Sequence, residues 1–183
     1  MKKFWIETWI NKVDIKSVKI CLAVFLTGCF THAFVLTNQL PNYDSQWFLY
    51  SPQDVVTSGR WFLKYAGGIS SYFHLQCLNG LLGIIYISLA AVFIIRCLDI
   101  NSMFLSFLAG MVLVVYPTVT KTFNFMYAAD AYFLAMLLSA VAAWMITKQN
   151  WFFRIGGGIT WNFGWNLSGI SLCCISSVVA VDY

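Results

Sequence analysis

Two aspartates are the residues of this chain whose type and position could do chemistry. Asp44 lies in a polar stretch beyond a long apolar run, where its carboxylate could take a proton from a hydroxyl as a general base. The alternative for Asp44 is a turn acid that bonds to its own backbone. Asp130 lies inside an apolar run, where burying a carboxylate in a membrane costs on the order of 3 kcal/mol. A partner or a function must offset that cost, unless Asp130 lies high enough to be hydrated.

Basic and aromatic residues accompany both acids. Arg60 precedes Trp61, and a guanidinium beside an indole could clamp a phosphate group. The alternative is an aromatic belt with an arginine on bulk lipid phosphate. The basic residues that could offset the charge of Asp130 are Arg60, Lys64 and Lys121. Tyr127 and Tyr132 could supply hydroxyls, and Tyr43 is a further supporting aromatic residue.

Other polar residues have structural explanations. Asp54 follows Ser51 and Pro52 in the pattern of a helix start, which already accounts for its carboxylate. His32 is interpreted as a packing or snorkelling residue of an apolar segment. The six cysteines show no C-x-x-C spacing and no cluster with histidine, so the sequence gives no support for a metal and leaves the cofactor requirement open.

The composition places these residues in a membrane protein. Hydrophobic residues make up 60% of the 183 positions, charged residues 10%, and the mean hydropathy is +0.74. So few charges could not cover the apolar surface of a soluble protein, whereas a bilayer accepts that surface if the backbone is paired within helices. The net charge of +4 does not indicate nucleic acid, because the basic residues are not interleaved with aromatics on one polar face.

The apolar runs predict an all-α, polytopic integral membrane protein with about four or five transmembrane helices. Residues 1–18 are expected to form a cytoplasmic interfacial amphipathic helix, followed by a membrane domain over residues 19–158. The expected spans are residues 20–36, 78–95, 103–119 and 125–146. An outer loop and a short surface helix are expected over residues 38–74. The tail, residues 159–183, is atypical and holds a candidate fifth span.

The distribution of lysine and arginine predicts the orientation. Eight basic residues fall on one side of these spans and three on the other: Lys2, Lys3, Lys12, Lys16, Lys19, Arg96, Lys148 and Arg154 against Arg60, Lys64 and Lys121. The side richer in lysine and arginine is the cytoplasmic one, so the N-terminus is expected to be cytoplasmic. Asp44 and Asp130 then share the outer face.

Residues 38–158 resemble the multi-spanning glucosyltransferases that modify O-antigen in phage-encoded serotype conversion, often called glucosyl transferase type II. The stretches that carry the resemblance are Leu40–Ser45, Ser58–Leu63, Gly67–Phe73 and Thr122–Tyr132. The resemblance implies transfer of glucose from a polyprenyl-phosphate donor to lipopolysaccharide O-antigen on the periplasmic face of the bacterial inner membrane. It also implies that the chain resembles the N-terminal part of a lipid-linked-sugar, GT-C-like glycosyltransferase.

The resemblance assigns a role to several residues. Asp44 becomes the base, Asp130 a second acid of the site, and Arg60 with Lys64 the contacts of the donor phosphate. Members of the family look longer, and the stretch from Thr160 onward does not resemble what is expected there. We therefore expect a truncated form, from a shifted reading frame.

Two other functions stay open at this point. One is a transport or flippase subunit for lipid-linked sugar, in which His32 and Asp130 would line a pathway. The other is a non-catalytic membrane partner. Most polar residues lie in the outer segment, residues 38–74, as a glycosyltransferase requires, rather than within the spans.

Overall fold

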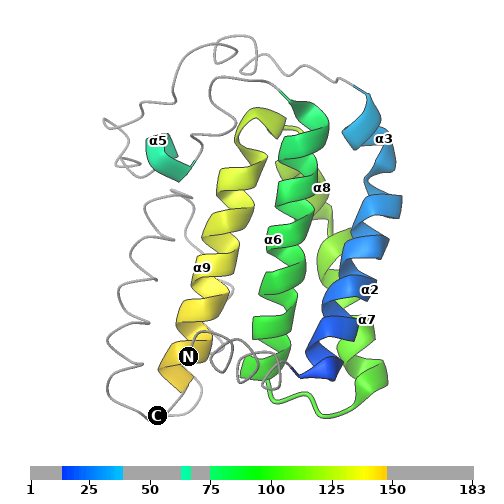
Figure 1. Ribbon diagram of the computed structural model, residues 1–183, viewed down its shortest axis with the longest axis vertical. Helices are drawn as coiled ribbons and strands as arrows, with labels where there is room; N and C mark the ends of the chain where they lie inside the picture. The colour runs from blue at the N-terminus through cyan, green and yellow to red at the C-terminus, as the bar shows by residue number, and fades with distance from the viewer. Residues whose placement is uncertain (1–13, 39–62, 67–74, 148–183) are drawn as a thin grey trace, which may run out of the picture.

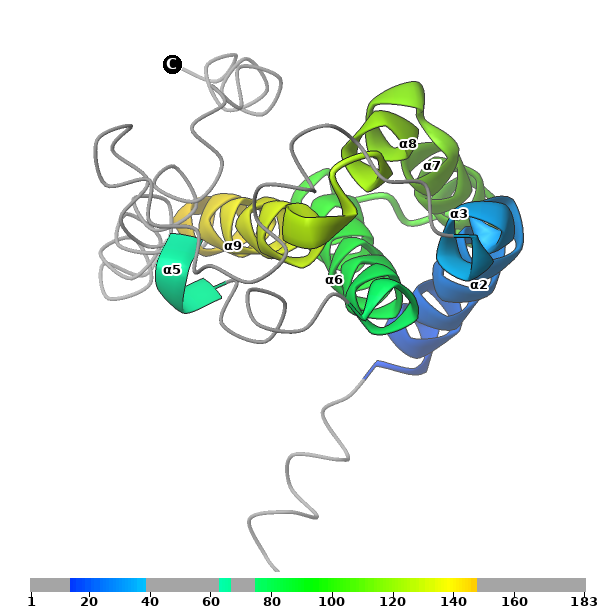
Figure 2. The ribbon, with the colours of Figure 1, turned by 90° about the horizontal axis from the view of Figure 1, so that it is seen from above.

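The computed structural model describes residues 14–38, 63–66 and 75–147, and every element in these ranges is helical. The four long helices run roughly side by side, as Figure 1 shows. Seen from above in Figure 2, α6 lies between α9 on one side and α2 with α7 on the other. The elements in chain order are α2 (Ile15–Thr31), α3 (Ala33–Thr37), α5 (Leu63–Ala66), α6 (Gln76–Cys97), α7 (Met103–Val115), α8 (Pro117–Phe123), the 3₁₀ helix η2 (Met126–Ala128) and α9 (Ala129–Thr147).

Helix α2 begins at a side-chain cap and ends at a break. The Asp14 carboxylate accepts a hydrogen bond from the backbone N–H of Lys16 at 3.1 Å, which satisfies one of the unpaired donors at the helix start. The helix stops at His32, whose backbone is non-helical, and α3 continues beyond it. The helix that contains the first expected span therefore starts at Ile15, earlier than the expected Ile20.

Helix α6 is the centre of the bundle because it packs against α2, α7 and α9. Ile84, Ile87 and Ala91 form part of the buried core on this helix. Its end is a Schellman cap: Asp99 has a left-handed φ of 50°, and the N–H of Ile100 donates to the carbonyl of Ile95 at 3.2 Å. This cap turns the chain toward α7.

Helices α7 and α8 form a bent pair. Ser102 caps α7, and the axis then turns by 43° between Val115 and Pro117. Pro117 lacks a backbone N–H and cannot continue α7, but it is well suited to the first position of α8. The expected span over residues 103–119 is therefore two helices, and the second reaches Phe123.

Close approach of helices is possible where glycine lies in the contact. A Cβ at Gly83 of α6 would lie 2.6 Å from the ring of Phe133 on α9. A Cβ at Gly110 of α7 would lie 2.5 Å from a methyl of Val24 on α2. Any side chain larger than hydrogen would push these helices apart.

The described helices include two that are long and apolar enough to cross a membrane, Gln76–Cys97 and Met126–Thr147, and a third if the bent pair α7 and α8 is one span. These helices confirm the broad prediction of a helical membrane protein. Helix α2 has 17 residues before its break at His32 and does not meet that test alone. The count of four or five spans stays a prediction.

Three expected elements lie wholly or partly outside the described residues. The interfacial helix over residues 1–18 is described only from Asp14, where α2 begins. Within the outer segment, residues 38–74, the structure describes Asn38 and α5. The tail over residues 159–183 is not among the described residues.

Candidate functional site

The predicted site residues divide into those that the structure describes and those that it does not. Asp130, Tyr127 and Tyr132 are described with their side chains, and Lys64 is described as part of the backbone of α5. Four predicted site residues lie outside the described residues and stay predictions: Tyr43, Asp44, Arg60 and Trp61.

Asp130 lies in the first turn of α9 with its side chain only 3% exposed. This burial removes the alternative in which Asp130 is simply hydrated. The partial positive charge at the start of a helix favours a carboxylate at this position. Helix α9 packs along α6, so this carboxylate lies at the head of the contact between the two helices.

The two described tyrosines lie on either side of Asp130. Tyr127 is buried in η2, directly before α9, and its ring meets Phe125 edge to face with centroids 6.4 Å apart. Tyr132 is half-buried in the first turns of α9. Both tyrosines therefore belong to the same end of the bundle as Asp130.

Helix α5 brings part of the outer segment against α9. Ala66 packs against Ala131 and Ala135, which are fully buried on α9. Figure 1 shows α5 beside the upper half of α9. The backbone that carries Lys64 is therefore near the head of α9, as the predicted site requires.

Lys121 makes no direct ion pair with Asp130. It is exposed on α8, and no hydrogen bond or ion pair joins these two described residues. Of the three basic residues suggested as partners by the sequence, only Lys121 is described with its side chain. The partner that offsets the charge of Asp130 stays a prediction.

His32 has a packing role. Its Nε2 atom lies 3.0 Å from the carbonyl oxygen of Val114, and because a carbonyl can only accept, the ring donates an N–H here. The ring also contacts Phe123, with centroids 4.6 Å apart. His32 is 2% exposed, so the packing interpretation is confirmed and the snorkelling alternative is wrong.

Asn79 is a buried residue at this end that sequence reasoning missed. It is fully buried on α6, and its Nδ2 atom donates to the carbonyl of Met126 in η2 at 3.4 Å. Among the described residues, its Oδ1 atom has no hydrogen-bond partner. The sequence did contain a signal, because burying an amide inside an apolar span costs free energy and so marks Asn79 as a candidate site residue.

The described residues form a helical membrane protein with a buried acid at one end. Among them, no group of three or more histidine, cysteine, aspartate or glutamate side chains could hold a metal ion. No curated protein and no solved structure matches the chain.

The family model described as glucosyl transferase GtrII matches residues 33–176, well over half of the chain. The chain belongs to this glucosyltransferase family, which confirms the resemblance. The match also runs past Thr160, where we expected the likeness to end. The proposed truncation stays a prediction.

Proposed function

We propose that this protein transfers glucose from a polyprenyl-phosphate donor to lipopolysaccharide O-antigen on the periplasmic face of the bacterial inner membrane. The observation that carries the proposal is the buried carboxylate of Asp130 at the head of α9, in a chain of the GtrII family. A buried intramembrane acid is by default a functional residue.

The chemistry is a displacement at the anomeric carbon of the donor glucose. Asp44 accepts the proton of an O-antigen hydroxyl, and the oxygen then forms a bond to the anomeric carbon. The bond to the phosphate oxygen breaks, and polyprenyl phosphate leaves with the electron pair. Arg60 and Lys64 stabilise the negative charge on the leaving phosphate.

The remaining predicted residues orient the reacting groups. Asp130 is the second acid of the site and accepts hydrogen bonds from sugar hydroxyls. Tyr43, Trp61, Tyr127 and Tyr132 surround the sugar with aromatic faces and hydroxyls. Tyr127 and Tyr132 adjoin Asp130 in the chain, which supports this arrangement.

The orientation follows from the basic residues. Lys16, Lys19 and Arg96 lie at the end of the bundle away from Asp130, as the course of α2, α6 and α9 in Figure 1 makes clear. If that end is cytoplasmic, in agreement with the lysine and arginine count, the head of α9 faces the periplasm. The N-terminus is then cytoplasmic and the protein is multi-pass.

A transport role finds less support. It would require His32 and Asp130 to line one pathway, but His32 is held by Val114 and packed against Phe123.

The test is glucosylation of O-antigen by membranes that contain the full chain. Asp44→Asn should lower the rate at least about a hundredfold, the range typical of general-base loss. The matched control is Asp54→Asn, which changes an acid of the same outer segment that we assign to helix capping. Equal losses in both variants, or none in Asp44→Asn, would contradict the assignment of Asp44.

A tag inserted after Asn42 tests the orientation separately. It should be reachable only from the periplasm, and access only from the cytosol would overturn the proposed topology.

A further inference from the structure

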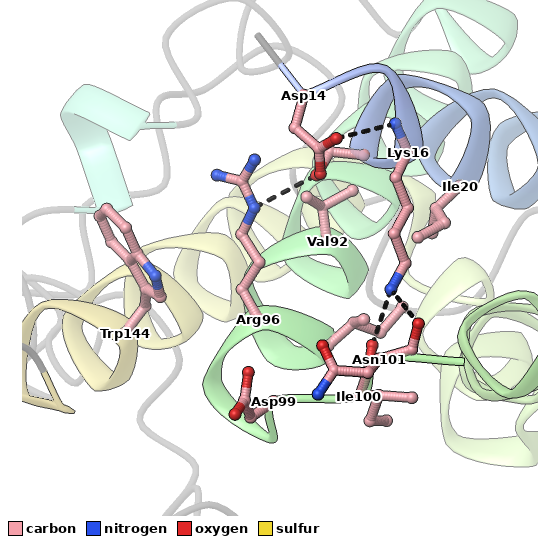
Figure 3. A pocket seen from close by; sticks show the side chains of 11 residues that line it. Asp14, Lys16, Ile20, Val92, Arg96, Asp99, Ile100, Asn101 and Trp144 are labelled. Carbon is pink, nitrogen blue, oxygen red and sulfur yellow. Dashed lines mark hydrogen bonds between the residues drawn. The ribbon is translucent and has the colours of Figure 1, made fainter. Parts of the chain in front are cut away.

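A cavity of about 370 Å³ lies at the end of the bundle opposite Asp130, between α2, α6 and α9. Figure 3 shows the side chains that line it. Its apolar lining includes Ile20, Val92 and Ile95, which are buried. Its polar lining includes two bases and two acids: Lys16, Arg96, Asp14 and Asp99. An apolar floor under a charged rim matches the boundary between lipid chains and headgroups.

Two of the four charged residues are already occupied by protein contacts. The Nζ atom of Lys16 donates to the carbonyl oxygens of Ile100 and Asn101 at 2.8 and 2.9 Å. The Asp14 carboxylate accepts from the backbone of Lys16 and from the hydroxyl of Ser17. The contacts of Lys16 hold α2 to the loop after α6, and those of Asp14 cap the start of α2.

The other two charged residues keep their binding groups available. Arg96 donates from Nε to the hydroxyl of Ser17 at 3.2 Å, and within the described residues its terminal nitrogens donate to no other atom. The Asp99 carboxylate, three residues along, takes part in no hydrogen bond or ion pair of the described part of the chain. In Figure 3 the guanidinium of Arg96 points away from Asp99. Both charged groups line the cavity, and within the described residues they do not pair with each other.

The backbone conformation at Asp99 is a second reason to assign its side chain to ligand binding. Its φ of 50° is a conformation that favours glycine, and the cap formed there needs only the backbone. Glycine at this position would form the same cap, so the cap does not need the aspartate side chain. A left-handed backbone position that carries a carboxylate without a partner among the described residues points to a ligand.

We propose that this cavity binds the headgroup of a zwitterionic phospholipid that carries a phosphate and a primary ammonium, as phosphatidylethanolamine does. Arg96 binds the phosphate through its two terminal nitrogens, and Asp99 binds the ammonium. The first part of an acyl chain lies on Ile20 and Val92. The two acids and two bases of the rim balance, so a lipid with no net charge fits better than an anionic one, which Asp99 would repel. The volume lies within the range of small-molecule sites.

The test is lipid binding to the purified full chain, followed by native mass spectrometry during titration with three lipids. Phosphatidylethanolamine should bind about tenfold more tightly than phosphatidylcholine, whose quaternary ammonium cannot donate a hydrogen bond to Asp99. Phosphatidylglycerol, which is anionic, should also bind more weakly. Tighter binding of phosphatidylglycerol than of phosphatidylethanolamine would overturn the proposal.

Variants separate the ligand contacts from the fold. Arg96→Gln and Asp99→Asn should each weaken phosphatidylethanolamine binding about tenfold, the size of one charge-assisted hydrogen bond. Asp99→Gly should weaken it equally while the unfolding temperature stays the same or rises, because glycine relieves the left-handed backbone. The matched control is Lys19→Gln, an exposed base of α2 outside the cavity. Unchanged binding in the Arg96 and Asp99 variants, or an equal loss in the control, would overturn the site.

Discussion

The two ends of the helical bundle hold their polar groups in opposite ways. At the end that contains Asp14 and Lys16, charged side chains lie at the surface and bond to backbone and hydroxyl groups. At the other end, three polar side chains are buried: His32, Asn79 and Asp130. A surface hydrogen bond is exchanged for water at little net cost, whereas a buried polar group that loses its partner has no such substitute. The comparison indicates that the polar contacts at the end with Asp14 and Lys16 hold the helices together. The buried polar residues at the other end cost free energy, which is why we place the proposed site there.

The largest effect is expected at Asp130. Asp130→Asn keeps the shape of the side chain but removes its charge, so glucosyl transfer should fall by about a hundredfold, because the sugar hydroxyls lose a charged hydrogen-bond acceptor. The measurement is the initial rate in membranes with matched protein levels. Ser139→Ala is the control, because Ser139 is also buried on α9 and its hydroxyl bonds only to the carbonyl of Ala135. Full activity of Asp130→Asn would make Asp130 a structural residue and would remove the contrast between the ends.

The next effect is on stability, at His32. His32→Ala removes the donor to the Val114 carbonyl and the contact with Phe123, and should lower the free energy of unfolding by about 2–3 kcal/mol. His32→Gln can keep an N–H donor near the same place and should lose less than half of that. Reversible unfolding in mixed micelles measures both. Equal losses in the two variants would show that the hydrogen bond contributes little.

A smaller effect is expected at Lys16, at the opposite end. Lys16→Met removes the bonds to Ile100 and Asn101 and should lower the free energy of unfolding by about 0.5–1 kcal/mol, because the contacts are near the surface. Lys19→Met serves as the control on the same helix and should change stability less. A loss as large as that of His32→Ala would break the comparison between the ends.

The smallest effect concerns the pH dependence of the α2 cap. The backbone N–H of Lys16 holds the pKa of Asp14 below its ordinary value of 3.8, with help from the Ser17 hydroxyl and the charge of Arg96. Because the pKa is lower in the folded state, this contribution to stability is complete above the ordinary value and is lost as the pH falls through the folded one.

The variant that tests the cap is Asp14→Asn. Asparagine also caps helices, so the variant should stay capped at pH 7 but should lack this part of the acid destabilisation. Unfolding curves of both proteins between pH 7 and about pH 3 measure the difference. Identical pH dependence in the two proteins would mean that the cap does not titrate as we expect.

Helix positions followed well from the apolar runs, but their ends did not. The expected segment over residues 78–95 lies within α6, and the segment over residues 125–146 largely coincides with η2 and α9. Hydrophobicity reports where lipid contact ends, whereas a helix continues until its backbone is capped. This is why α2 begins at Ile15, beneath the cap of Asp14, and includes two lysines.

The breaks within helices could not be predicted from pattern alone. The apolar run that contains His32 is continuous, and the hydrogen bond of His32 reaches Val114, which is 82 positions away. Pro117 is a local signal of a helix break near the end of the expected span over residues 103–119. It begins a new helix instead, because proline is suited to the first helical position.

The candidate site was predictable in its residue types more than in its contacts. A carboxylate inside an apolar run indicated a buried acid, and Asp130 is buried. Spacing could not identify its neighbours: Lys121 was a reasonable partner by side of the membrane, yet it is exposed on α8. Asn79 was overlooked because a single amide has no motif. The roles of Asp44 and Arg60 stay predictions.

The bend between α7 and α8 has a consequence for the surrounding lipid. A helix inclined by 43° after Val115 reaches roughly 3 Å less far along the direction of α7 than a straight helix of the same length would. Lipid beside a short hydrophobic segment compresses to match it. We therefore expect the leaflet to be locally thinner around α8. The sugar of the proposed lipid-linked donor would then lie closer to the depth of Asp130.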